Sequence, residues 1–392
     1  MKKGWQTKKV SEIAKHSLGK MLDKAKNKGK PQPYLRNLNV RWFDFDLSDV
    51  LEMPFLPTEA AKYTAVKGDV LICEGGYPGR AAIWEKDEPI YFQKALHRVR
   101  FHEPERNRWF LYYLLSKDLD DTLKDHFNGA GIQHFTGEAL ARFEVPLPPL
   151  AEQQRIVGLL DEAFEGLATA KANAERNHQN ARALFESHLQ SVFTQRGPGW
   201  VEKKVSEIAK HSLGKMLDKA TNKGEPQPYL RNINVRWFTF DLSDLLQMPF
   251  LPTEAEKYTA IKGDVLICEG GYPGRAAIWD EDYPIYFQKA LHRVRFHQPE
   301  LNKWFVYYLS VQDSSGQLKK HFSGTGIQHF TGEVLARFPI PVPPLPELRQ
   351  AVAKFDALSE ETQRLARLYE RKLAALEALK KSLLHQAFTG AL

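Results

Sequence analysis

The sequence is poor in cysteine and contains no long apolar run. Only two of its 392 residues are cysteine, Cys73 and Cys268, so a disulfide framework is not expected and a reducing cytoplasm is the natural compartment. The first ten residues, MKKGWQTKKV, lack the apolar core of a signal peptide. No apolar stretch approaches the roughly 20 residues that a membrane-spanning helix needs.

Familiar signatures of catalysis are also missing. The segment GYPGRA lacks the Lys-Ser/Thr pair of a phosphate-binding P-loop. Neither the Asn-Pro-Pro-aromatic tetrapeptide of amino-methyltransferases nor a CxxC or HExxH metal-binding spacing occurs. We therefore expect no active site and no metal in this chain. A metal-dependent nuclease built on His126 or His134 is the enzyme alternative.

The composition is that of a folded, basic protein. Hydrophobic residues make up 43% of the chain, which is enough for a large core. The net charge is +7 and the isoelectric point is about 9.1. This charge favours a phosphate-bearing partner such as nucleic acid, although many basic proteins bind none.

A long internal repeat dominates the sequence. An offset of 195 residues carries Trp5 onto Trp200 and Phe193 onto Phe388 without a gap. A repeat of this length is a whole domain with a helix rather than a solenoid unit. Two near-identical surfaces predict two near-identical targets, which a hyphenated palindrome in duplex DNA presents at a fixed spacing. Between Lys8 and Glu105 the copies differ at twelve positions: Lys26, Lys30, Leu38, Asp44, Val50, Glu52, Ala61, Val66, Glu85, Lys86, Glu88 and Glu103.

Each copy is predicted to contain a mixed α/β domain followed by a helix. In the first copy, residues 8–19 favour an opening helix or turn, and Lys20–Pro33 is a basic loop broken by glycine and proline. Tyr34–Phe45 alternates like a strand, which would place Asn37, Asn39 and Arg41 on one face. Further expected elements are strands at Val70–Cys73, Ala81–Trp84 and Ile90–Phe101, a helix at Arg106–Lys117 and a Pro-rich strand at Phe143–Leu150.

The proline-free segment Glu152–Gln195 predicts one long helix. About 40 residues at 1.5 Å each give a rod of roughly 60 Å. Seven-residue spacing in both copies predicts that each helix packs along another, and the other copy's helix is the available partner. Packing against the α/β domain alone is the alternative. The predicted interface positions are Leu160, Leu167, Ala174, Ala181, Phe355, Thr362, Tyr369, Leu376 and Leu383.

Three clusters in each copy have side chains suited to DNA. Arginine and lysine can pair with guanine, asparagine and glutamine with adenine, and basic groups bind phosphate. Taken singly, such residues are more often solvated charges or turn-bonding side chains, so the prediction depends on the clusters. The first-copy candidates are Lys20, Tyr34, Arg36, Asn37, Asn39, Arg41, Tyr77, Arg80, Gln93, Lys94, Gln133 and His134. The second-copy candidates are Lys215, Tyr229, Arg231, Asn232, Asn234, Arg236, Tyr272, Arg275, Gln288, Lys289, Gln328 and His329.

The ordered motifs resemble the specificity subunit of type I restriction–modification systems. PYLRNLNV (Pro33–Val40) and KGDVLICEGG (Lys67–Gly76) are similar to strand segments of that family. GAGIQHFTGEAL (Gly129–Leu140) precedes VPLPPLAEQQRIV (Val145–Val157), which is similar to the Pro-Pro-Leu-x-Glu-Gln start of a conserved helix in the family. The set occurs twice and spans nearly the whole chain.

The resemblance implies an α+β fold with two mixed α/β target-recognition domains in tandem. Two long helices separate the domains and form an antiparallel coiled coil with pseudo-two-fold symmetry. The domains would be residues 1–150 and 197–345, and the helices residues 151–196 and 346–392. Each domain would read half of a bipartite double-stranded DNA site. Two methyltransferase subunits, which bind S-adenosylmethionine, would dock on this non-catalytic, cofactor-free chain, and restriction (motor–nuclease) subunits would join where a restriction function exists.

Two departures from the family pattern carry predictions. Leu348 stands where the first copy has Gln153, which predicts a different subunit contact. The two domains are nearly identical, whereas the family usually pairs unlike ones. This predicts an inverted repeat with identical half-sites, centred about one helical turn (~10 base pairs) apart. A stand-alone DNA-binding repressor and a coiled-coil scaffold whose domains bind protein remain alternatives.

Overall fold

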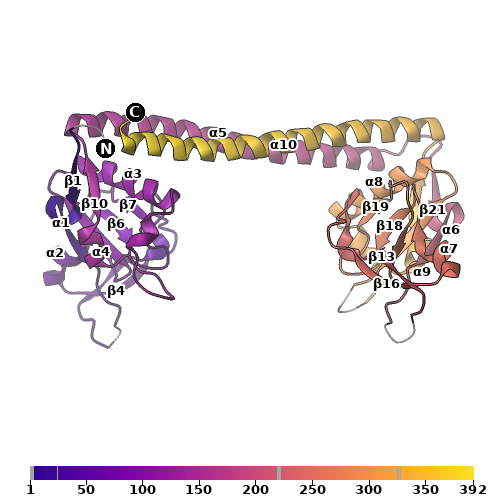
Figure 1. Ribbon diagram of the computed structural model, residues 1–392, viewed down its shortest axis with the longest axis horizontal. Helices are drawn as coiled ribbons and strands as arrows, with labels where there is room; N and C mark the ends of the chain where they lie inside the picture. The colour runs from indigo at the N-terminus through magenta and orange to yellow at the C-terminus, as the bar shows by residue number, and fades with distance from the viewer. Residues whose placement is uncertain (1–3, 24, 219–221, 325, 327) are drawn as a thin grey trace. The chain divides into compact units, whose positions relative to one another are not determined.

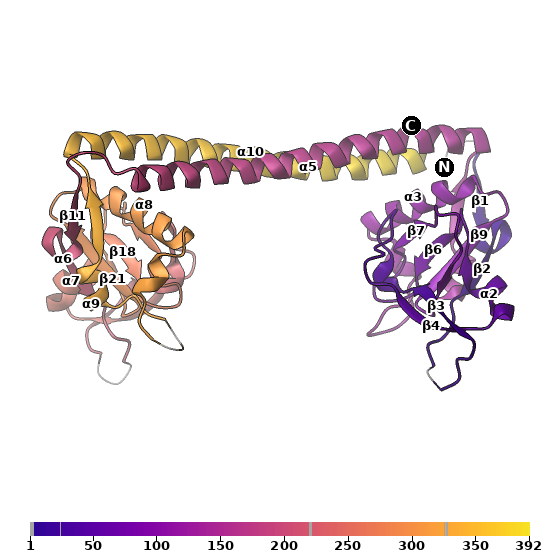
Figure 2. The same cartoon turned by 180° about the vertical axis from the view of Figure 1, so that it is seen from behind.

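The chain folds into two units. The computed structural model describes residues 4–23, 25–218, 222–324, 326 and 328–392, so Lys24 of the basic loop and Ile327 of the second GIQHF segment lie outside the described residues. One unit comprises Met1–Glu175 with Glu370–Leu392, and the other comprises Arg176–Tyr369. Each unit therefore combines one α/β domain with parts of both long helices (Figures 1 and 2).

The first α/β domain contains two four-stranded sheets and a separate strand pair. One sheet has the antiparallel order β2-β9-β6-β7; the other has the order β4-β3-β8-β5, in which β3 runs parallel to β8. Strands β1 and β10 form the pair. The strands are β1 (Gln6–Lys9), β2 (Ala14–Leu18), β3 (Lys30–Leu35), β4 (Leu51–Phe55), β5 (Thr64–Ala65), β6 (Val70–Cys73), β7 (Ala81–Ile83), β8 (Ile90–Phe92), β9 (Leu96–Phe101) and β10 (Glu144–Leu147).

Helices surround these sheets, and the second unit repeats the set. The first unit contains α1 (Val10–Ile13), η1 (Asn37–Asn39), η2 (Pro57–Glu59), α2 (Ala60–Tyr63), α3 (Arg106–Leu119), η3 (Leu123–His126) and α4 (Gly137–Arg142). The second contains β11 (Val201–Lys204), α6 (Val205–Ile208), β12 (Ala209–Leu213), β13 (Glu225–Leu230), η4 (Asn232–Asn234), β14 (Val235–Arg236), β15 (Thr239–Phe240), β16 (Leu246–Phe250), η5 (Pro252–Glu254), α7 (Ala255–Tyr258), β17 (Thr259–Ala260), β18 (Val265–Cys268), β19 (Ala276–Ile278), β20 (Ile285–Phe287), β21 (Leu291–Phe296), α8 (Glu300–Ser314), η6 (Leu318–His321), α9 (Gly332–Arg337) and β22 (Pro339–Val342).

Strand β6 shows why the core has two layers. Val70 and Ile72 belong to a core cluster that includes Trp109 of α3, whereas Leu71 and Cys73 belong to a cluster with the other sheet. Because successive strand residues point to opposite faces, a strand that is buried on both faces reads as a continuous apolar run. The predicted strands at Val70–Cys73 and Ala81–Trp84 are confirmed for this reason.

The predicted long helices are confirmed as α5 (Leu150–Thr194) and α10 (Leu345–Thr389), and the one proline of α10, Pro346, lies in its first turn. In the first unit, Arg155 donates to the carbonyl of Leu392 and Lys171 pairs with Glu377 at 2.9 Å. The partner number falls as the number on α5 rises, so the two helices run antiparallel there. In the second unit, His188 and Phe193 of α5 both approach Phe355 of α10.

The burial of the predicted interface positions is compatible with helix packing, and the helix ends pack on the domains as well. All nine predicted positions are buried or half-buried, with Leu160, Ala174 and Phe355 at most 1% exposed. Leu160 and Leu384 also belong to the core cluster that contains Trp109. The helix ends therefore pack on an α/β domain as well as on each other, so both kinds of packing considered from the sequence occur.

Two predicted elements differ in part from the structure. Residues 8–19 form strand, a four-residue helix and strand, because β1 pairs with β10 and β2 with β9 far along the chain. In the Tyr34–Phe45 segment the strand ends at Leu35, and Asn39 accepts a hydrogen bond from the backbone N–H of Arg36 at 2.9 Å. This closes the turn η1, so Asn37, Asn39 and Arg41 do not share a strand face.

Gln153 and Leu348, where a different subunit contact was predicted, both lie in the interior of the described chain. Each side chain is 1% exposed. Gln153 donates to the carbonyl of Pro148, whereas Leu348 joins the apolar core of the second unit. The exchange therefore changes the interior of each unit. Within the described residues, none of the helices has the length and apolarity required to cross a membrane.

Candidate nucleic-acid interface

The three predicted clusters meet around the loop Glu74–Arg80 in the first unit. Asn37 donates through Nδ2 to the carbonyl of Gly75, and Arg80 donates back to the carbonyl of Asn37, both at 3.0 Å. The backbone N–H of Glu74 donates to the carbonyl of Ala95 at 2.9 Å, and the carbonyl of Glu74 accepts from the N–H of Phe135 at 2.7 Å. Candidate residues that are far apart in the sequence therefore surround one loop.

Glycine allows these segments to approach so closely. Gly76 has φ +78°, and a Cβ atom there would lie 2.2 Å from Nδ2 of Asn37. A Cβ atom on Gly75 would lie 2.9 Å from Nδ1 of His134. Neither position has space for a larger side chain. Glycine at both positions therefore allows the loop to pack directly against Asn37 and His134.

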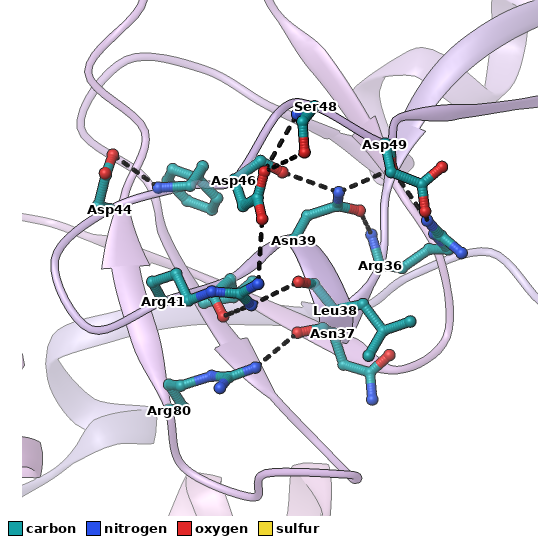
Figure 3. A network of polar contacts seen from close by, with 12 residues as sticks. Arg36, Asn37, Leu38, Asn39, Arg41, Asp44, Asp46, Ser48, Asp49 and Arg80 are labelled. Carbon is teal, nitrogen blue, oxygen red and sulfur yellow. Dashed lines mark hydrogen bonds and ion pairs between the residues drawn. The ribbon is translucent and has the colours of Figure 1, made fainter. Parts of the chain in front are cut away.

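A polar network holds the first cluster in place (Figure 3). Asn39 donates to the carbonyls of Asp46 and Asp49 at 2.9 and 3.0 Å. Arg36 pairs with the carboxylate of Asp49 at 2.6 Å, and Arg41 pairs with Asp46 at 3.1 Å. Hydrogen bonds from Ser48, with a smaller contribution from the charge of Arg41, lower the pKa of Asp46. The network fixes the backbone that carries both arginines.

Several candidates lie in the interior rather than at a surface. Lys20, Tyr34 and Asn39 are 7%, 2% and 2% exposed. Lys20 donates to the carbonyl of Pro54 at 2.8 Å and pairs with Glu59 at 2.6 Å. These partners give the residues structural roles in this conformation. The second-copy residues Lys215, Tyr229 and Asn234 are equally buried.

Other candidates present polar groups to solvent. The Arg41 side chain is 48% exposed although it pairs with Asp46. Tyr77 is 57% exposed, and the guanidinium carbon of Arg80 lies 4.0 Å from the centre of its ring. Gln93 and Asn37 are half-buried. Lys94, Gln133 and His134 are exposed.

The second unit builds the same surface. Asn232 donates to Gly270 and Arg275 donates to Asn232, both at 3.0 Å. Arg275 lies 4.0 Å from the ring centre of Tyr272, which is 60% exposed. Arg231 pairs with Asp244 at 2.7 Å. Arg236, Lys289 and Gln328 are exposed, and Gln288 and His329 are half-buried.

The sequence did not identify two features of this surface. Asp46 and Asp49 set the positions of Arg41 and Arg36. In the sequence, only the position of these aspartates shortly after Asn37-Leu38-Asn39 could have indicated this role. Leu38 is also 54% exposed beside the polar network, and the matching Ile233 is 43% exposed. An apolar side chain at such a place can contact the methyl group of thymine.

No candidate metal centre accompanies these side chains. In the described part of the chain, no three His, Cys, Asp or Glu residues are grouped so that they could hold a metal ion. The ring of His126 packs edge-on against Phe143, with centroids 4.8 Å apart. Cys73 and Cys268 are buried, and burial raises the pKa of each thiol to about 11. The site is therefore suited to binding through hydrogen bonds and charge.

The chain therefore contains two matching α/β domains, and each positions the same set of polar side chains around an equivalent loop. A profile described as the type I restriction modification DNA specificity domain matches residues 2–175 and 198–372. The chain belongs to this family, and it is a type I specificity subunit, as the motifs predicted.

Known relatives show the same similarity. The chain is 23% identical over 308 residues to the MjaVIII specificity subunit of Methanocaldococcus jannaschii, covering 72% of this chain and 69% of that one. It is 22% identical over 340 residues to the EcoBI specificity subunit of Escherichia coli, covering 80% and 71%.

Solved structures share the fold. A chain from a study of assembly and conformational transition in a type I restriction–modification system matches with a TM-score of 0.79 and 20% identity, over 100% of this chain and 99% of that one. The HsdS subunit of Thermoanaerobacter tengcongensis matches with a TM-score of 0.65 and 20% identity, over 100% and 98%.

Proposed function

We propose that this specificity subunit reads two nearly identical half-sites arranged as a hyphenated inverted repeat in duplex DNA. One observation carries the proposal: the polar side chains around the two loops are the same in both copies. Arg36, Asn37, Asn39, Arg41 and Arg80 match Arg231, Asn232, Asn234, Arg236 and Arg275. Equal donors and acceptors select equal bases, and duplex DNA presents equal half-sites about a dyad.

The exposed side chains divide into two proposed roles. Arg41 is suited to a base edge because its guanidinium offers several donors in one plane. Lys94 is suited to a phosphate because an ammonium group binds as a point charge. Arg80 stacks on Tyr77, so the pair offers a planar, cationic surface to the nucleic acid. The buried candidates shape the loops that carry these groups.

The chain itself performs no chemistry in this proposal. Two methyltransferase subunits that bind S-adenosylmethionine dock on it, and restriction subunits join where the system cleaves DNA. The assembly acts in the cytoplasm. The repressor and scaffold alternatives are not favoured by membership of the specificity family.

Selection from randomised duplexes tests the proposal. The purified chain, assembled with its methyltransferase subunits, would be incubated with a random library, and the bound DNA would be sequenced. We expect an enriched inverted repeat with the same bases in both halves. Enrichment of two unrelated half-sites would contradict the proposal, and equal binding to every duplex would contradict sequence reading altogether.

A further inference from the structure

The two near-identical domains differ where the segment that carries Phe43, or Phe238 in the second copy, meets the long helix. Phe164 on α5 corresponds to Ser359 on α10, and Leu160 corresponds to Phe355. The aromatic ring is therefore one helical turn earlier in the second copy. Phe43, whose ring faces Phe164 in the first copy, has an identical counterpart, Phe238, in the second copy.

In the first unit, the ring of Phe164 packs against the rings of Phe43 and Tyr112. Its ring centroid lies 6.4 Å from that of Phe43 and 5.2 Å from that of Tyr112. Lys380 of α10 lies over the same ring at 5.3 Å. Phe43 has φ +65°, a conformation that a bulky residue adopts only when its surroundings hold it.

In the second unit, a cavity lies against the matching residue. Phe238 keeps φ +66° but is 39% exposed. A cavity of about 330 Å³ is lined by Phe238, Ile278, Val306 and Tyr307. Phe355 does not fill it, because its ring packs on Trp304 and Tyr307.

Helix α5, whose final part belongs to the second unit, does not fill this cavity either. Phe185 of α5 approaches Tyr307 with a centroid distance of 6.3 Å, but it is not part of the cavity lining. A second cavity of about 380 Å³ adjoins the first and shares Ile278, Lys303 and Asp356 with it. The two cavities lie side by side along α8 and α10, and together they are named the groove.

The groove also contains a polar group without a partner. Asn302 lines the second cavity and is only 9% exposed. Its Nδ2 donates to the carbonyl of Gly263 at 2.6 Å, whereas its Oδ1 has no hydrogen-bond partner among the described residues. A buried acceptor without a donor is costly, so an occupant that supplies a donor is favoured.

The chemistry of the groove favours a protein segment over DNA. Asp280 and Asp356 line the cavity beside Phe238, and their carboxylates oppose a phosphate. Lys303 is paired with Asp356 at 2.7 Å, so its charge is partly neutralised. The first copy shows which group suits the place beside Phe238 and Tyr307. In that copy, Phe164 supplies a phenyl ring beside the equivalent residues Phe43 and Tyr112.

We propose that an aromatic side chain of a docked methyltransferase subunit inserts beside Phe238 in the second copy, where the first copy supplies Phe164 from its own chain. A neighbouring donor of that subunit satisfies Asn302. This inference takes its partner from the proposed function. It makes the two halves of the protein unequal in partner docking, although the side chains around Glu74–Arg80 match those around the equivalent loop, residues 269–275.

The test fills the groove in the full-length chain. Ser359→Phe introduces the ring that Phe164 provides in the first copy, and Phe164→Ser is the matched variant that removes it. The affinity for the purified methyltransferase subunit would be measured by isothermal titration, with circular dichroism and thermal unfolding as checks of folding. We expect Ser359→Phe to weaken docking at one of two sites by roughly tenfold or more, as for the loss of an aromatic anchor.

A direct probe keeps the inference testable if a variant folds poorly. N-acetyl-phenylalanine amide should give a saturation-transfer NMR signal with the natural chain, and the signal should disappear in Ser359→Phe or the smaller Ser359→Leu. Unchanged docking in a folded Ser359→Phe variant would overturn the inference, as would probe binding that ignores both substitutions. Docking that is sensitive to residue 359, together with selection of two unrelated half-sites by the natural assembly, would overturn the half-site proposal alone.

Discussion

Phe388, near the end of α10, packs against Trp109 of α3 with ring centroids 4.7 Å apart. The second unit contains the equivalent contact, in which Phe193 near the end of α5 lies 4.5 Å from Trp304. Each α/β domain is therefore completed by the end of the helix that follows the other domain in the sequence. Loss of either ring should weaken the unit that receives it.

Phe388→Ala should destabilise the first unit. The ring also contacts Tyr113 at 5.1 Å, so truncation leaves a cavity beside two aromatic residues. We expect a loss of about 2–3 kcal/mol in the free energy of unfolding, less than for a fully buried phenylalanine because Phe388 is half-buried. Denaturant titration followed by tryptophan fluorescence measures it. Leu379→Ala, at a residue that is 47% exposed, is the control, and an equal effect of both would contradict the packing argument.

Asp69→Ala should also be destabilising. Asp69 is 1% exposed, receives two hydrogen bonds of 2.7 Å from Arg100 and accepts another from the backbone of Val66. Removing the carboxylate leaves these donors unpaired, so we expect a loss of about 3 kcal/mol in unfolding free energy. Asp87→Ala, which breaks the exposed pair with Lys67, should change thermal stability little. A similar shift for both variants would refute the importance of burial.

Stability should depend on pH through two buried histidines. Burial, with a smaller effect of the neighbouring His16, lowers the pKa of His97 to about 4, and His292 behaves likewise beside His211. The unfolded imidazole has a pKa near 6.5. The folded state therefore favours neutral histidine, so this contribution is complete above about pH 6.5 and is lost as the pH falls towards 4.

The matched variant for this prediction is His97→Gln, which retains a donor for the carbonyl of Phe135 that His97 contacts at 3.1 Å. Thermal unfolding would be followed between pH 4 and 7. The variant should lose less stability than the natural chain across this interval. Parallel curves for the two proteins would show that His97 does not contribute.

Arg41→Ala and Arg236→Ala should have matching effects on DNA binding. If each arginine reads a base, each substitution should cost about 1–3 kcal/mol in binding free energy and relax the preference at one base of its half-site. Competition binding of the assembled complex with duplexes altered in one half-site measures this. An equal loss against every sequence would assign both residues to phosphate contacts instead.

The sequence predicted the elements that depend on local pattern. Val70–Cys73 is a continuous apolar run after a Lys-Gly-Asp turn, and Glu152–Gln195 is a long segment without proline. Both patterns are sufficient for their structures because burial on two faces and helix propagation require no distant partner to be known. The internal repeat then extended each assignment to the second copy.

The remaining errors came from contacts between distant residues. The segment 8–19 forms strands because it meets β10 and β9. Asn39 closes a turn with the backbone of Arg36, and its amide is held there by the carbonyls of Asp46 and Asp49. Lys20 is a predicted DNA ligand, and only the folded chain brings Glu59 within 2.6 Å of its ammonium group. The residue types around the candidate site could be predicted, whereas their division into interior and surface could not.

In the proposed function, the matching side chains around Glu74–Arg80 and the equivalent loop, residues 269–275, read two equal half-sites. Methylation sequencing of a genome that carries this system tests it most directly, because every modified site reports the sequence that the assembly selected. We expect a hyphenated inverted repeat in which both halves have the same bases, with modified bases at symmetric positions. An asymmetric site built from two unrelated half-sites would contradict it.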